Sequence, residues 1–193
     1  EQNLITSHGD SWRGFAVARV EAEQRARHGA ASENEHRDIT LDEIGLHLAS
    51  QLALNVSDRD MVMTLERETE LMLVQAVPFG AAITEVARSR GMRVVVVSDN
   101  YMPATHLLQM AHRAGYSWIT EDDIFVSCEH GGLKHNGMLW PVVLSVLNVP
   151  AGSILHVGDD AHADGEVPQS LGIATHVRDT MRTSHRDMIN TTP

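Results

Sequence analysis

The sequence is poor in cysteine, in long apolar runs and in positive charge. Its 193 residues include one cysteine, Cys128, so no disulfide can form within the chain and a reducing, cytoplasmic setting is expected. No stretch approaches the roughly 18 apolar residues of a membrane-spanning helix, and no signal peptide is recognisable at the start. The net charge of −11 argues against a nucleic-acid-binding protein, which needs a basic face.

Zinc-binding patterns are also missing. The twelve histidines are scattered, with no His-x-x-x-His pair and no cysteine–histidine cluster at zinc spacing. Most of them are therefore interpreted as surface residues. What remains is a chain of ordinary globular composition, 42% hydrophobic and 21% charged, long enough for one sizeable domain with a helical appendage.

The pattern along the chain changes near residue 78. Residues 1–77 predict only helices, and residues 78–193 predict alternating helices and strands. Such alternation with short connections is typical of an α/β fold with a Rossmann-like parallel sheet. The predicted helices are 11–29, 40–54, 57–75, 81–90, 103–114, 137–147 and 161–171, and the predicted strands are 93–98, 124–127, 153–157 and 173–177.

Polar residues with a shared chemistry follow the predicted strands. In parallel sheets, ligands bind beyond the carboxyl ends of the strands. A hydroxyl and an ammonium group hold phosphate oxygens, and carboxylates hold a divalent metal. This combination favours phosphoryl transfer, in which positioning and charge neutralisation do most of the work. The residues are Ser98, Asp99 and Asn100 after the first strand, Lys134 after the second, and Asp159, Asp160 and Asp164 after the third.

These residues resemble the conserved motifs of the haloacid dehalogenase (HAD) superfamily over roughly residues 78–178. VVVVSDNY resembles motif II, GLKHNG motif III and HVGDDAHADGEVPQSLGIAT motif IV. The resemblance implies a magnesium-dependent phosphohydrolase with a helical cap over residues 1–77. It implies that Ser98 binds the transferring phosphate, that Lys134 offsets its charge, that Asp159 ligates Mg²⁺, and that Asp160 and Asp164 orient the metal or its waters. Asp99 and Asn100 are expected to touch a small phosphorylated substrate, for which a sugar phosphate is one candidate.

The chain departs from the family at its first motif, a strand ending in Asp-x-Asp that carries the nucleophile. The one Asp-x-Asp is Asp58-Arg59-Asp60, and the residues after it predict a helix, with Ser57 as its cap. We therefore expect the nucleophile strand upstream of Glu1. The alternative is a catalytically inactive HAD-like module that binds a partner. Two partner arrangements stay open, a homodimer and a partner domain upstream in the same polypeptide.

Simpler interpretations compete for several other residues. Cys128 follows a predicted strand and is expected to be a small buried hydrophobe instead of a nucleophile. Three histidines in the predicted site loops, His130, His135 and His162, are expected at the surface. An apolar cluster is expected to form the core or interface of the cap; it consists of Met61, Met63, Leu65, Leu71, Met72 and Leu73.

Overall fold

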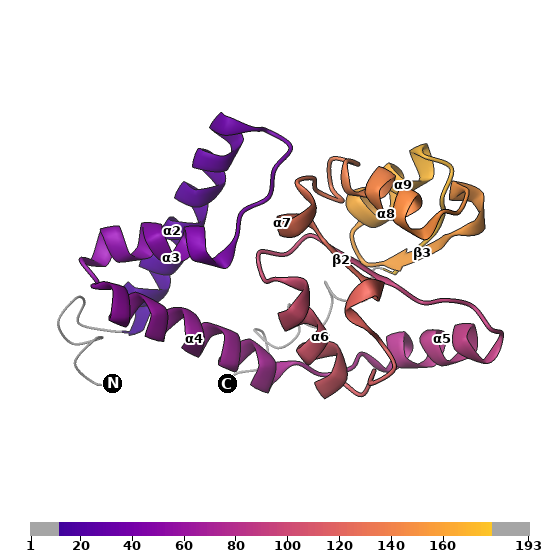
Figure 1. The fold of residues 1–193 in the computed structure, drawn as a ribbon, viewed down its shortest axis with the longest axis horizontal. Helices are drawn as coiled ribbons and strands as arrows, with labels where there is room; N and C mark the ends of the chain where they lie inside the picture. Colours follow the sequence, from indigo (N-terminus) through magenta and orange to yellow (C-terminus); the bar gives the residue numbers. More distant parts are fainter. Residues whose placement is uncertain (1–11, 179–193) are drawn as a thin grey trace, which may run out of the picture. The chain divides into compact units, whose positions relative to one another are not determined.

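The computed structural model describes residues 12–178, and the chain forms two units, residues 1–129 and residues 130–193. Each unit contains helices and one two-stranded parallel sheet (Figure 1). The mixed α/β class is therefore confirmed, whereas a single Rossmann-like sheet stays a prediction. The predicted division between a cap and a core at residue 77 also stays a prediction.

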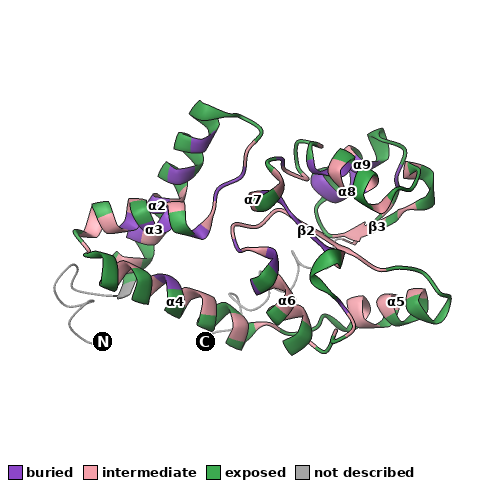
Figure 2. Ribbon diagram, viewed as in Figure 1, coloured by how far each residue is buried: buried purple, intermediate pink, exposed green. Residues whose placement is uncertain are grey.

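Three helices build the first part of the first unit: α2 (Trp12–Glu33), α3 (Leu41–Leu52) and α4 (Val56–Leu73). One face of α2 carries alanine at every fourth position, and these small side chains pack against buried aliphatic residues of α3. Figure 2 shows the buried residues of α2 and α3 in purple. The alanines are Ala18, Ala22, Ala26 and Ala30.

The helix ends follow local capping chemistry. Thr40 and Glu43 form the predicted capping box of α3, with the Thr40 N–H donating to the Glu43 carboxylate at 2.7 Å. Helix α4 begins earlier than predicted, because Asn55 rather than Ser57 caps it and accepts the Asp58 N–H at 3.0 Å. Helix α2 continues past Gly29, where the backbone keeps a negative φ and glycine is tolerated.

The prediction that the apolar cluster forms the core of the cap is largely wrong, whereas the alternative that it forms an interface of the cap stays a prediction. Met63 is 2% exposed and belongs to the core between the helices. Met61, Leu65, Met72 and Leu73 are exposed instead. Helical spacing explains the difference, because only one face of α4 meets α3, and Met63 lies on that face.

Helix α5 (Pro78–Ser89) begins at its proline, which suits the first helical turn because proline has no N–H to satisfy. It contains no fully buried residue. Among residues 12–178, no single helix is long and apolar enough to cross a membrane; α4 and α5 meet that test by length and composition only as a pair bent by 76°.

The sheet of the first unit joins β1 (Val96–Ser98) to β2 (Ile124–Val126) in parallel, with Ser98 opposite Val126. Helix α6 (Ala104–Arg113) packs on β2, and the short helix α7 (Ser127–His130) follows it. Strand β2 is buried, as Figure 2 shows, whereas β1 is only half-buried and shorter than the predicted strand over 93–98. Within the described residues β1 has a strand neighbour on one side alone.

The second unit pairs β3 (Leu155–Gly158) with β4 (Ala174–Val177) in parallel, beside helix α8 (Leu139–Leu147). The predicted helix over 161–171 is instead a π-helix, η3 (Ala161–Glu166), followed by the short α9 (Val167–Ser170). Pro168 has no N–H for the carbonyl four residues earlier, which interrupts the regular α-helical ladder at this point.

Candidate functional site

The first group of predicted site residues follows β1. Ser98 ends the strand, and its hydroxyl forms no hydrogen bond within the described part of the chain. Asn100 is held firmly, because its backbone N–H donates to the Ser127 hydroxyl at 2.9 Å and its side-chain oxygen accepts the Met102 N–H at 2.8 Å. Asp99 lies between them and is half-buried. The loop therefore has a defined backbone and presents an available hydroxyl.

The second group lies in the second unit and centres on Asp164. The Lys134 ammonium contacts Asp164 Oδ1 at 2.5 Å, and His156 Nε2 lies 2.8 Å from the same oxygen. The Asp164 side chain is only 3% exposed, whereas that of Lys134 keeps 14% of its surface. An ammonium has three N–H donors and this ion pair uses one of them. The geometry thus fixes where the positive charge of Lys134 lies.

Asp164 also shapes the turn after β3. Its Oδ2 accepts the backbone N–H groups of Asp159 and Asp160, each at 3.0 Å. Gly158 makes this approach possible, because a Cβ there would lie 2.2 Å from the Asp164 carboxyl carbon. The Asp164 carboxylate therefore has partners on both oxygens. Its Oδ1 contacts the side chains of Lys134 and His156, and its Oδ2 accepts two backbone N–H groups of the turn.

The electrostatics follow from these contacts. Burial acts to raise the pKa of Asp164, but hydrogen bonds from His156 and Lys134 outweigh it and hold the pKa well below its usual range. The exposed Asp160 accepts the N–H groups of Ala163 and His162, and these bonds lower its pKa. Both acids therefore stay ionised at neutral pH.

The residues of this turn fit a magnesium ion in part. Within residues 12–178 no group of three or more His, Cys, Asp or Glu residues is placed to hold a metal. Magnesium usually takes only one or two carboxylates and completes its shell with water and substrate phosphate. Asp159 is exposed, and its carboxylate forms no hydrogen bond or ion pair within the described residues, so this carboxylate suits that role. Asp164 holds the turn instead of facing solvent.

The structure brings Lys134, Asp159, Asp160 and Asp164 together in the second unit and places Ser98, Asp99 and Asn100 on one loop of the first. Convergence of the two groups stays a prediction. Sequence reasoning missed His156, although a histidine inside the apolar run SILHV was a usable signal. It also missed the buried pair Asp38 and Ser127, for which the sequence offers no pattern.

Other predicted residues have simpler roles. Asp58 and Asp60 both lie in α4, as the helical interpretation predicted, and Asp60 pairs with Arg59 at 2.7 Å. His135 and His162 are exposed, with ring centres 4.7 Å apart, and His130 is half-buried.

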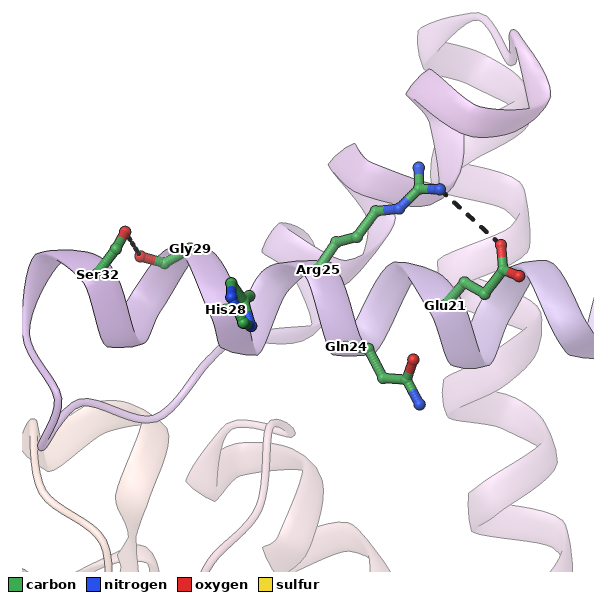
Figure 3. A pocket seen from close by; sticks show the side chains of 6 residues that line it. All are labelled: Glu21, Gln24, Arg25, His28, Gly29 and Ser32. Carbon is green, nitrogen blue, oxygen red and sulfur yellow. Dashed lines mark hydrogen bonds and ion pairs between the residues drawn. The ribbon is translucent and has the colours of Figure 1, made fainter.

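Two surface hollows contain none of the predicted site residues. Figure 3 shows the first, lined along α2 by Glu21, Gln24, Arg25, His28, Gly29 and Ser32. Its Arg25–Glu21 ion pair spans 3.9 Å. The second lies between α4 and α6 and includes Arg67 and His106. Neither hollow combines a hydroxyl, an ammonium group and carboxylates in the manner of the loops above.

No family model matches the sequence, and no curated protein is significantly similar to it.

Proposed function

We propose that this chain carries the second, third and fourth motifs of a HAD-type, magnesium-dependent phosphohydrolase that acts on a small phosphomonoester. The observation that carries the proposal is the Lys134–Asp164 ion pair at 2.5 Å, with Asp164 also holding the Asp159–Asp160 turn. This ion pair joins Lys134, in a loop, to Asp164, which follows the next strand, β3. The lysine and the acid occupy the positions at which the chain resembles motifs III and IV.

The strand pairing supports the same proposal. The family fold places its first strand between the strand of motif II and the strand of motif IV. Here β1 pairs with β2 and β3 pairs with β4, with no pairing between β1 and β3 in residues 12–178. A strand from a segment preceding Glu1 would complete one sheet and satisfy backbone groups on the open edges of β1 and β3.

In the proposed reaction, the carboxylate of the first aspartate of that strand forms a bond to phosphorus as the ester P–O bond breaks, and the second aspartate of its Asp-x-Asp protonates the leaving alkoxide. Water then hydrolyses the aspartyl phosphate. Lys134 and Ser98 bind phosphate oxygens and offset charge in both steps, and Asp159 holds Mg²⁺, which neutralises further phosphate charge. Asp99 and Asn100 lie beside the transferring group.

The test uses the full-length polypeptide with p-nitrophenyl phosphate. We expect phosphate release that requires Mg²⁺ and stops with a chelator. Lys134→Ala and Asp159→Asn should each remove most of the activity, whereas Asp58→Asn, a half-buried acid in the first turn of α4, should leave it unchanged. Full activity in both site variants would refute the assignment.

The second candidate is a non-catalytic HAD-like module that binds a partner. It is favoured by one observation: the only Asp-x-Asp of the sequence lies in helix α4 and not at the end of a strand. Finding an Asp-x-Asp strand in the upstream coding sequence, together with magnesium-dependent turnover, would eliminate this candidate.

A further inference from the structure

A series of buried hydrogen bonds connects the helical part of the first unit to the loop after β1. It begins at Asp38, in the segment between α2 and α3, whose carboxylate is 3% exposed. Asp38 Oδ1 accepts the Ile39 N–H at 2.8 Å and a guanidinium N–H of Arg27 at 3.0 Å. A buried polar group is costly without hydrogen-bond partners, and these contacts supply partners to the Asp38 carboxyl group.

The series of hydrogen bonds continues through Ser127, the first residue of α7, which has no exposed surface. Its hydroxyl lies 2.5 Å from Asp38 Oδ2 and 2.9 Å from the Asn100 nitrogen. A backbone N–H can only donate, so Ser127 accepts from Asn100 and uses its single proton to donate to Asp38. The direction of both hydrogen bonds is thus fixed by chemistry.

The same loop is tied to the helices at two further points. The carbonyl of Tyr101 accepts the N–H of Leu41, the first residue of α3, at 2.9 Å. Met102 is 2% exposed and belongs to the core shared with α2 and α3. The backbone from Ser98 to Met102 is therefore held by residues that precede it in the sequence by about sixty positions.

We propose that Asp38 is a positioning residue for the phosphate-binding hydroxyl of Ser98. Through Ser127 it fixes the Asn100 amide, two residues from Ser98, and so sets the direction in which the loop leaves β1. Asp38 does not touch the substrate. The inference rests on the proposed function, because it is that function which gives Ser98 a phosphate to bind. It makes the helical segment part of the catalytic apparatus of the first unit.

The test compares wild type, Asp38→Asn and Ser127→Ala in the full-length polypeptide. In Asp38→Asn one carboxylate oxygen becomes an NH2 group, which only donates, so the side chain cannot accept from Ser127 and also from Ile39 and Arg27. Ser127→Ala removes the central link and leaves Asp38 paired with Arg27. The matched control is Asp42→Asn, an exposed acid in the first turn of α3. The readouts are kcat and KM for p-nitrophenyl phosphate and exchange of the Asn100 amide hydrogen, measured by NMR.

We expect kcat to fall roughly 10- to 100-fold in both variants, as for a misplaced loop, with KM changing less than about threefold. Asn100 should be protected from exchange in the wild type and lose that protection in both variants, whereas Asp42→Asn should match the wild type. The exchange rate of the Asn100 amide in wild type is a test by itself, so the inference can be checked even if a variant fails to fold. Rapid exchange of the Asn100 amide in wild type would overturn the inference.

The two failures are distinguishable. An active wild type with unchanged kcat and unchanged Asn100 exchange in Asp38→Asn and Ser127→Ala overturns the positioning role alone. A wild type without magnesium-dependent turnover overturns the proposed function, and the positioning role falls with it.

Discussion

At the scale of single residues, Cys128 shows how surroundings suppress a reactive group. It is the second residue of α7, and its thiol donates to the Met102 carbonyl at 3.4 Å. Burial raises the pKa of the thiol to about 12, with nearby Glu129 and Asp38 adding to the effect. The thiolate is the nucleophile in cysteine chemistry, and this site disfavours it.

Cys128 should therefore resist alkylation. At pH 8.5 an unperturbed thiol is about half ionised, so we expect iodoacetamide to modify native Cys128 at least about a hundredfold more slowly than the guanidinium-unfolded chain. Mass spectrometry over time gives both rates. Comparable rates in the two states would show that the thiol is freely reactive.

The same scale shows what the sequence can reveal about a site. Lys134, Asp159 and Asp164 were predicted from their positions after strands, and the structure brings these three together in one unit. The role of Asp164 in holding the turn was not predictable, because it depends on Gly158 admitting a carboxylate beside the backbone. Asp38 could not be found at all, since its partner Ser127 lies 89 residues away.

At the scale of elements, the turn between β3 and η3 is organised by one buried carboxylate. Asp164 joins Lys134, His156 and two backbone N–H groups, so the start of η3 is fixed to the end of β3. A π-helix replaces the predicted α-helix here, and the reason is Pro168, which has no N–H to donate to the preceding turn. The proline stands in the sequence, but its effect on the helix was not predicted.

Asp164→Asn should destabilise this element strongly. Breaking a buried ion pair costs about 3–5 kcal/mol, because the remaining charge loses its partner. The native pKa of Asp164 lies below its unfolded value, so its contribution is present at neutral pH and is lost as pH falls below about 4. The variant should therefore lose less stability than wild type on acidification.

Denaturant unfolding at pH 7 and pH 3 measures both effects. Asp160→Asn is the control: Asp160 is exposed, and asparagine caps helices about as well as aspartate, so we expect its unfolding free energy to match that of wild type far more closely than Asp164→Asn does. Equal stability of Asp164→Asn and wild type at pH 7 would contradict the role of Asp164.

Element boundaries were predicted best where side chains cap the backbone locally. The Thr40–Glu43 capping box was read directly from sequence, and Gly115 and Gly172 end their segments with positive φ. Prediction failed where tertiary packing decides, as on α4, where Met63 alone of its methionines enters the core.

At the scale of the whole molecule, the candidate residues divide between the two units. The first unit carries the Ser98 hydroxyl on a loop held by Asp38 through Ser127, and the second carries the Lys134 ammonium group and carboxylates held by Asp164. The proposed function requires both groups, so we expect that neither unit alone hydrolyses phosphomonoesters.

The most direct measurement is a crystal structure of the full-length polypeptide with Mg²⁺ and orthovanadate, which mimics the transferring phosphoryl group. If the proposed function is correct, the Ser98 hydroxyl and the Lys134 ammonium group contact the same vanadate, and Asp159 ligates the adjacent Mg²⁺. A structure that places Ser98 and Lys134 at opposite edges of the strands, with no shared ligand, would contradict it.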